Sequence, residues 1–271
     1  MNTSSLQYIY GPVYSWRLGW SLGIDPISRP EKICNFDCVY CQLDSTQRLQ
    51  IDREVFVPAA AIVAEARAIK DVTIDYLTFS GRGEPTLAAN LGEMIAALRG
   101  SRPEKIAVIT NGGLLGREDV RRDLKGADRV LIKFDAGRRA SWQAVDRPHP
   151  AQTFAQLLAG IKQFRQAFSG QIAFQLMFIE ANKNEAAAMA ELLKTLRPDE
   201  IQLNTPLRPS GVSPLNEAAM RKIQKQFHFF SCPVRMVYEA QKQEYLPLND
   251  HDTALRHGNF HSKPVKGEKT L

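Results

Sequence analysis

The fold is decided by the stretch Ile33-Cys-Asn-Phe-Asp-Cys-Val-Tyr-Cys-Gln42, which holds Cys34, Cys38 and Cys41 at C-x3-C-x2-C spacing. Three thiolates this close together can wrap one face of a [4Fe–4S] cube, whereas an ordinary cubane site needs four Cys. No protein ligand for the fourth iron is evident nearby, and an open iron can bind a small molecule. The spacing therefore predicts an iron–sulfur cluster with one open iron.

Two other uses of these thiols fit the sequence less well. A structural zinc site would need a fourth Cys or His near the three, and no His lies between Met1 and His149. A disulfide framework is typical of secreted chains, but the remaining cysteine, Cys232, is far along the chain and no signal peptide is evident. The pattern favours the cluster, with zinc or unrelated thiols as alternatives.

Composition is that of an ordinary globular protein. The 271 residues are 44% hydrophobic and 24% charged. We expect one large domain over residues 1–248 and a flexible basic tail over 249–271. No apolar run reaches the length of a spanning helix, and the N-terminus lacks a secretory pattern. These features predict a cytoplasmic protein that does not act in a membrane.

The net charge is +6 and the isoelectric point is about 9.2. This balance is compatible with an anionic substrate, including RNA, without requiring one. Much of the excess lies at Arg121-Arg122, at Arg138-Arg139 and in the tail. Solvated surface is the more economical interpretation of these pairs, because no RNA-binding module signature accompanies them.

Strand-like and helix-like segments alternate along the chain. Predicted strands end in turn signals and cover residues 17–24, 74–80, 105–110, 129–134, 171–179, 200–204 and, as a further edge strand, 234–238. Predicted helices cover residues 58–70, 91–99, 118–125, 153–168, 184–196 and 216–227. The alternation favours parallel β/α units. About six such units are too few for a closed eightfold barrel.

Polar and glycine-rich residues follow the predicted strands at their carboxyl ends. The chemistry of β/α barrels lies at that end. The residues in question are Gly81, Gly83, Glu84, Thr110, Asn111, Asp135, Glu180 and Asn204. Lys133 and Asp135 are two apart, so they share one face of their strand. An otherwise apolar strand carrying this pair predicts a charged group inside the barrel.

The cysteine stretch resembles the radical SAM superfamily, whose form C-x3-C-x-aromatic-C is matched with Tyr40 as the aromatic residue. The resemblance implies an α/β fold that is a partial, open β/α barrel of about six units. It implies that S-adenosylmethionine (SAM) binds the open iron. It also implies reductive cleavage of SAM to a 5′-deoxyadenosyl radical, which abstracts a hydrogen atom from a substrate.

Several residues take SAM-binding roles from the same resemblance. Ser80-Gly-Arg-Gly-Glu84 is similar to the superfamily's Gly-Gly-Glu region, which meets the SAM amino group, although Arg82 stands where a second Gly is usual. Glu84 offers an acceptor to an ammonium. The further expected contacts are Tyr40 near the adenine, Thr110 and Asn111 at the ribose or carboxylate, Lys133 and Asp135 at SAM or substrate, and Asn204. An Asn-Gly turn is an equal interpretation of Asn111.

A narrower resemblance covers roughly residues 10–215. With Thr78-Phe-Ser-Gly-Arg-Gly-Glu-Pro-Thr86 and Arg147-Pro-His-Pro150, the chain looks like the wyosine-synthase-like group of iron–sulfur oxidoreductases. Wyosine synthases of tRNA carry a second cluster from extra N-terminal cysteines, and here no Cys precedes Cys34. The resemblance therefore implies the broad enzyme class, with a wyosine-like modification of tRNA as one candidate reaction.

The expected function is that of a radical SAM enzyme acting on RNA, a peptide or a small metabolite, with a reductase or flavodoxin-type protein as electron donor. A non-catalytic iron–sulfur binding or regulatory protein is the main alternative. Such a module would need neither the region around Glu84 nor the β/α alternation. An activating enzyme for a partner protein is a third candidate.

Overall fold

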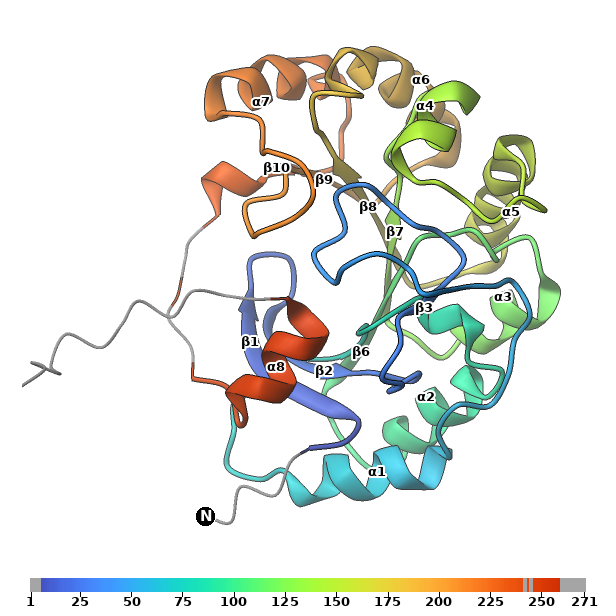
Figure 1. Ribbon diagram of the computed structural model, residues 1–271, viewed down its shortest axis with the longest axis vertical. Coiled ribbons are helices and arrows are strands. Elements are labelled where there is room, and N and C mark those ends of the chain that lie inside the picture. The colour runs from blue at the N-terminus through green and yellow to red at the C-terminus, as the bar shows by residue number, and fades with distance from the viewer. Residues whose placement is uncertain (1–5, 241–242, 244–245, 259–271) are drawn as a thin grey trace, which may run out of the picture.

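The computed structural model describes residues 6–240, 243 and 246–258. Within these residues, the main sheet contains eight strands and curls around a central space, with helices on its outer side (Figure 1). In spatial order the strands are β1 (Ile9–Ser15), β2 (Gly19–Ile24), β5 (Tyr76–Phe79), β6 (Lys105–Thr110), β7 (Arg129–Lys133), β8 (Gln171–Met177), β9 (Glu200–Asn204) and β10 (Val234–Met236).

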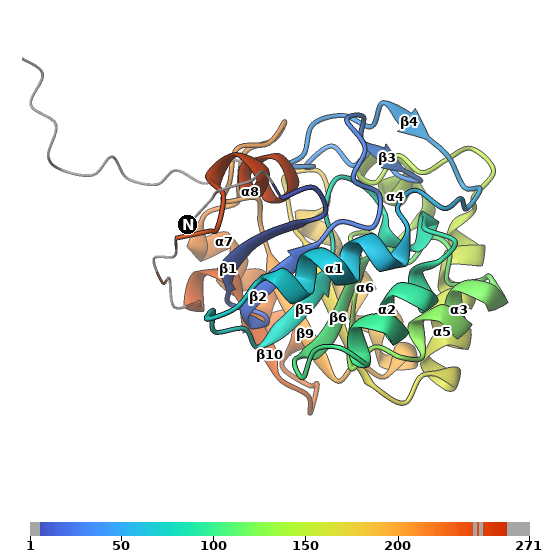
Figure 2. The same cartoon turned by 90° about the horizontal axis from the view of Figure 1, so that it is seen from below.

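Helices follow most of the strands and pack on the outer face of the sheet (Figure 2). The helices of the described chain are α1 (Ala59–Ala68), α2 (Leu91–Arg99), α3 (Glu118–Leu124), α4 (Arg139–Val145), α5 (Phe154–Ala167), α6 (Ala186–Leu196), α7 (Glu217–Gln224) and α8 (Asp250–His257), the last of which lies beside β1. A short pair, β3 (Ile33–Cys34) and β4 (Arg48–Leu49), holds the loop that follows β2.

The expected fold class is confirmed. Strands β2 and β5–β10 run parallel, and β1 pairs antiparallel with β2. The edge strands β1 and β10 do not pair with each other in the described part of the chain, so the barrel stays open there. We call this open side the seam. The predicted strands at 105–110 and 200–204 match β6 and β9 residue for residue.

The alternation of side chains along the strands separates two cores. In β7, Val130 and Ile132 join the large core between the sheet and the helices. Leu131 points the other way and packs with Leu18 and two alanines in a small cluster inside the curl. Apolar side chains therefore fill the inner space around the middle of the sheet, while the polar residues gather at the carboxyl ends of the strands.

The structure differs from the sequence-based expectation at both ends of the chain. Strand β1 was not expected from the sequence, because it pairs directly with β2 and no helix lies between the two strands. The expected tail over 249–271 is wrong for Asp250–His257, which form α8 beside β1 (Figure 1). The hydroxyl Oγ1 of Thr253 accepts a 3.0 Å hydrogen bond from the Gly11 amide, which fixes α8 to β1. Residues 259–271 lie outside the described residues.

No helix among the described residues combines the length and the apolar character needed to cross a bilayer.

Candidate functional site

The cysteine loop lies across the carboxyl end of the sheet. Cys34 ends β3, and Cys38 and Cys41 follow in the loop; all three are half-buried and none forms a disulfide. The loop is held by the backbone, since the Val39 amide donates to the Val145 carbonyl at 2.9 Å. In the part of the chain that the structure describes, no three His, Cys, Asp or Glu side chains converge on one metal ion. An iron–sulfur cluster does not require the three sulfur atoms to converge on one point, because each thiolate binds its own iron.

The environment of the thiols fits a cationic group. Burial raises the pKa of the Cys34 thiol to about 12. Burial and then the charge of Asp146 raise the pKa of Cys38 well above its usual value. Metal ligation needs thiolates and releases protons, so positive iron would be required to keep these thiols ionised. Three soft thiol donors on one loop are the donor set that an iron–sulfur cluster takes.

Lys32 is a nearby cation that sequence reasoning missed. Its side chain is 3% exposed, and its ammonium donates to the Asp44 carbonyl at 2.8 Å. Burial lowers the pKa of this ammonium, but the charges of the Cys41 and Cys34 thiolates outweigh burial and raise it. The only available signal was a lysine two positions before the first cysteine. The Lys32 ammonium offsets part of the negative charge of the thiolates.

The glycine segment after β5 docks against the cysteine loop. Gly83 has a φ of 154° and forms an isolated bridge with Ile33, the neighbour of Cys34. A Cβ on Gly83 would stand 1.9 Å from the Ile33 carbonyl oxygen. A Cβ on Gly81 would stand 2.4 Å from the Asp25 carboxyl carbon. Both glycines are therefore required for the close approach of the two segments.

Glu84 occupies the expected place, but its carboxylate is already engaged within the protein. One oxygen accepts from the Thr86 amide at 3.1 Å, the Thr86 hydroxyl at 2.7 Å and the Thr110 hydroxyl at 2.6 Å. The other oxygen accepts from the Asn111 amide at 2.8 Å. The residue is 2% exposed. Because a carboxylate has about four acceptor positions, this arrangement favours a structural tie between the ends of β5 and β6.

Asn111 connects the end of β6 to the cysteine loop. Its side-chain amide donates to the Asn35 side-chain oxygen at 2.6 Å and lies 3.7 Å from the Cys34 sulfur. Its own oxygen accepts from the Gly113 amide at 2.9 Å. The Asn-Gly turn is thus present, and the same side chain also lies beside the first cysteine.

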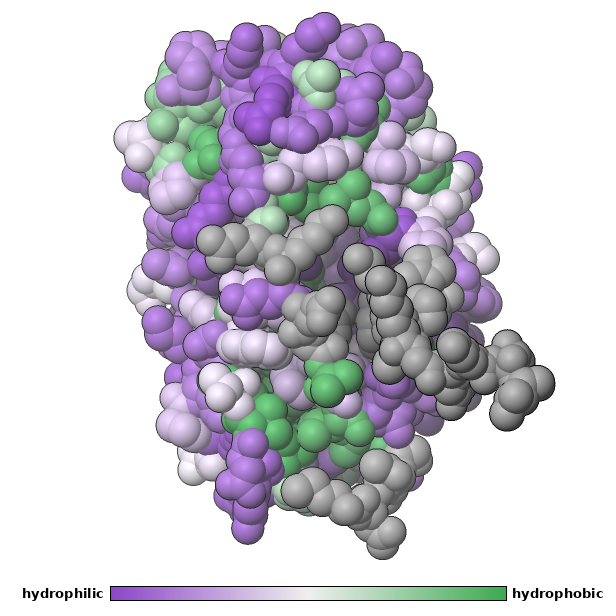
Figure 3. All heavy atoms as spheres, turned by 90° about the vertical axis from the view of Figure 1, so that its left-hand side faces the viewer, coloured by the Kyte–Doolittle hydropathy of each residue, from purple (hydrophilic) through white to green (hydrophobic). Residues whose placement is uncertain are grey.

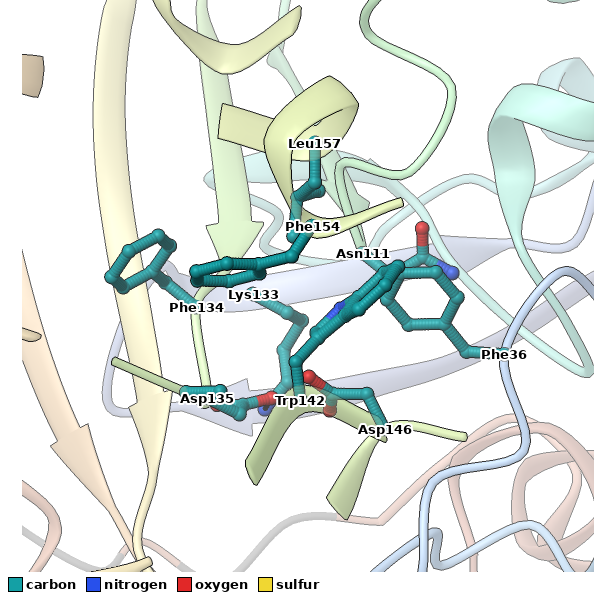
Figure 4. A pocket seen from close by; sticks show the side chains of 10 residues that line it. Phe36, Asn111, Lys133, Phe134, Asp135, Trp142, Asp146, Phe154 and Leu157 are labelled. Atoms are coloured by element: carbon teal, nitrogen blue, oxygen red, sulfur yellow. Dashed lines mark ion pairs between the residues drawn. The ribbon is translucent and has the colours of Figure 1, made fainter. Parts of the chain in front are cut away.

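A buried polar cluster surrounds Tyr40, and Figure 4 shows three of its members, Lys133, Asp135 and Asp146. The Tyr40 hydroxyl donates to the Asp135 carboxylate. The Lys133 ammonium lies 3.4 Å from the same carboxylate and 4.8 Å from the centre of the Tyr40 ring. The Met177 amide donates to the other Asp135 oxygen at 2.5 Å. The expected pair Lys133 and Asp135 does point into the barrel, together with the expected Tyr40.

Asp146 completes this cluster and was not expected from the sequence. It follows α4, a helix that the sequence pattern did not indicate, and is 4% exposed. Its carboxylate lies 3.7 Å from the Cys38 sulfur and 3.4 Å from the Tyr40 hydroxyl. Burial and then the charge of Asp135 raise its pKa well above the usual value. Asp146 therefore links the second cysteine to the charged cluster.

The cluster borders a narrow pocket of about 10 Å³ that also has aromatic walls, including Phe36 and Trp142 (Figure 4). Asn111, Lys133 and Asp135 line it. Asn204 does not, although it lies at the carboxyl end of β9. It lines a larger pocket at the seam with Arg208. The structure thus brings most of the expected residues to one place and leaves Asn204 at a separate opening.

Comparisons with known proteins agree with this geometry. A family model described as Radical SAM superfamily matches residues 30–193. A UPF0026 protein of Synechocystis sp. is 40% identical over 210 residues, which cover 77% of this chain and 78% of that protein. A radical SAM methyltransferase from Sphaerobacter thermophilus aligns with a TM-score of 0.58 at 17% identity, covering 80% of this chain and 65% of that one. Streptococcus suis SuiB bound to S-adenosylmethionine aligns with a TM-score of 0.56 at 12% identity, covering 79% and 46%. The chain spans about half to two thirds of these two solved chains.

Proposed function

The chain belongs to the radical SAM superfamily, and we propose that Cys34, Cys38 and Cys41 hold the [4Fe–4S] cluster with which this enzyme cleaves SAM. The observation that carries the assignment is the placement of three thiols at the carboxyl end of a partial barrel. When bound, the reduced cluster and SAM supply a one-electron cleavage that yields methionine and a 5′-deoxyadenosyl radical. The protein positions these groups and excludes side reactions.

We assign the SAM-binding surface to the residues around the cysteine loop. Because Glu84 is engaged within the protein, the backbone at Gly81 and Gly83 is proposed to recognise the SAM ammonium. Asp135 is also engaged, by Tyr40 and Met177, and its proposed role is to orient Lys133 beside SAM. Lys133 provides a cation for the SAM carboxylate, and the close approach of Gly83 to Ile33 keeps the glycine backbone beside the first cysteine. Tyr40 keeps its proposed place near the adenine, and Asn204 keeps its proposed role from the separate pocket at the seam.

For the substrate, we propose an RNA. A wyosine-like modification of tRNA has two supports, the sequence motifs and the net charge of +6. A flavodoxin-type protein or a reductase is the proposed electron donor, since the cluster must receive one electron in each cleavage. The cytoplasm is the proposed location, because an exposed iron–sulfur cluster is best protected in a reducing compartment.

The test begins with anaerobic reconstitution of the full chain. Iron and sulfide analysis is expected to give about four of each per chain, as for one cubane. Dithionite-reduced protein with SAM is then expected to release 5′-deoxyadenosine. Ala in place of Cys34, Cys38 or Cys41 should abolish both results, whereas Cys232→Ala serves as the matched control and should retain them. Zinc in place of iron, or cleavage that survives the first three changes, would contradict the assignment.

A further inference from the structure

A pocket of about 310 Å³ opens at the seam. It lies between the hairpin that joins β1 to β2 and the segments that follow β9 and β10. We call it the seam pocket, and its polar and aromatic lining includes Tyr14, Trp16, Arg17, Gln42, Asn204, Arg208 and His257. Figure 3 shows this side of the molecule, where apolar residues form separate groups among hydrophilic surface.

Arg17 is the unusual member of this lining. Its guanidinium stacks on the Trp16 ring at 5.5 Å, and its Nε atom is buried with no hydrogen-bond partner. Among the described residues, no carboxylate pairs with it. A buried guanidinium nitrogen without an acceptor is costly, so an acceptor from a bound molecule would stabilise this arrangement of the described residues.

Like charges converge on the same pocket. Arg208 Nη1 lies 2.9 Å from Nδ1 of His257. Burial and then the charge of Arg208 lower the pKa of Arg17 to about 10, and burial with the same two arginines lowers the pKa of His257 well below its usual value. None of the described residues that line the pocket is Asp or Glu. The described part of the lining therefore favours an anion over a cation.

The pocket also reaches the site that holds the cysteines. Gln42, which lines it, directly follows Cys41 in the sequence. Asn204, which also lines the pocket, ends β9 at the carboxyl edge of the sheet. A molecule anchored at Arg17 would extend past Gln42 toward the cluster loop.

We propose that the seam pocket binds an oxyanion of the substrate, a phosphate or a carboxylate, with Arg17 as its anchor. The planar fork of an arginine fits either group through two parallel hydrogen bonds. Among the described residues no carboxylate pairs with the Arg17 guanidinium, which leaves its two terminal nitrogens for a bound oxyanion. That the bound molecule is the substrate of the radical reaction rests on the proposed function. That the seam pocket binds an oxyanion rests only on the geometry of the pocket.

The experiment is calorimetric titration of the reconstituted full chain without reductant, at constant ionic strength. Inorganic pyrophosphate is the probe for a phosphate and succinate the probe for a carboxylate. At least one of them is expected to bind, and the tighter one identifies the class of anion. Arg17→Gln should weaken that binding about tenfold or more, because charge-assisted hydrogen bonds are lost. The matched control is Arg122→Gln on the exposed face of α3, which removes the same charge and should bind as the unmodified protein does.

Two results would overturn the proposal. One is the failure of both probes to bind the unmodified protein, and the other is equal affinity in Arg17→Gln. If circular dichroism shows that this variant does not fold, Arg17→Lys decides instead. It keeps the charge and loses the fork, so a loss of roughly threefold is expected, and unchanged affinity counts against the site. The titration needs no SAM cleavage, so a failure to bind either anion would not contradict the assignment of the cysteines to the cluster. Likewise, a failure of SAM cleavage would not contradict the oxyanion site.

Discussion

Replacing Glu84 with Gln tests whether this residue is a structural tie or a SAM ligand. An amide keeps one acceptor oxygen, which can serve Thr86 and Thr110, but its NH2 group then faces the Asn111 amide across 2.8 Å. Two buried donors are left without an acceptor, at about 1–3 kcal/mol each, and the remaining bonds lose their charge assistance. We expect a loss of about 2–4 kcal/mol in the free energy of unfolding.

The assay is urea unfolding of the metal-free protein, followed by circular dichroism. In thermal unfolding the same loss corresponds to a midpoint lowered by roughly 5–15 °C, at about 2–4 °C per kcal/mol for a chain of this size. Glu93→Gln is the matched control, because Glu93 is exposed in the first turn of α2. Neutralising it should change the free energy of unfolding by only about 0.5 kcal/mol.

The structural interpretation of Glu84 is refuted if Glu84→Gln unfolds like Glu93→Gln. A fall of about tenfold in SAM affinity with unchanged stability would instead indicate a direct contact with the SAM ammonium, at the strength of one charge-assisted hydrogen bond. The two outcomes are separable because the unfolding assay contains no SAM and the affinity is measured on folded, cluster-loaded protein.

Two further changes test the packing and the charges around the site. Gly83→Ala should destabilise the protein by about 1–3 kcal/mol and lower cluster content, because the new Cβ would meet the Ile33 carbonyl; Gly116→Ala, with nothing within 4 Å, is the control in the same urea assay. Asp119→Asn should cost about 1 kcal/mol at neutral pH, where the Arg117 guanidinium holds the pKa of the Asp119 carboxyl well below its usual range. That contribution is present above the unfolded pKa near 4 and is lost as pH falls through the folded value, so the two proteins should converge in acid, and a gap that widens below about pH 4 would contradict this account.

The central strands could be predicted because each is a short apolar run with a clear end. Lys105–Thr110 is followed by Asn-Gly, and Glu200–Asn204 is followed by Thr-Pro, so their bounds agree with β6 and β9. Strand β1 gave no such signal, because it is an antiparallel edge in an otherwise parallel sheet. Its position depends on a distant contact, since the Tyr10 hydroxyl and the Ser80 hydroxyl lie 2.5 Å apart. Local patterns carry no information about pairs of this kind.

The candidate site divides in the same way. The cysteines, the glycine segment and the pair Lys133 and Asp135 were recognisable, because each lies at a strand end or in a motif with fixed spacing. Asp146 was not, since it enters the site through contacts with Cys38 and Tyr40 that are far apart in the sequence. The role of Glu84 as a SAM contact stays a prediction for a related reason. Its residue type indicates an acceptor, but only the structure shows which donors already occupy it.

Helix α8 shows how a segment without a local signal is ordered by charge. Arg256 donates to the Gln7 carbonyl, and its Nε lies 3.6 Å from the Asp25 carboxylate. Asp25 in turn accepts from the Arg82 amide at 3.2 Å and lies where a Cβ on Gly81 would stand. The end of the chain is thereby connected to the glycine segment beside the cysteine loop. Because His257 lies in the same helix and lines the seam pocket, the packing of α8 on β1 also fixes one wall of the proposed oxyanion site.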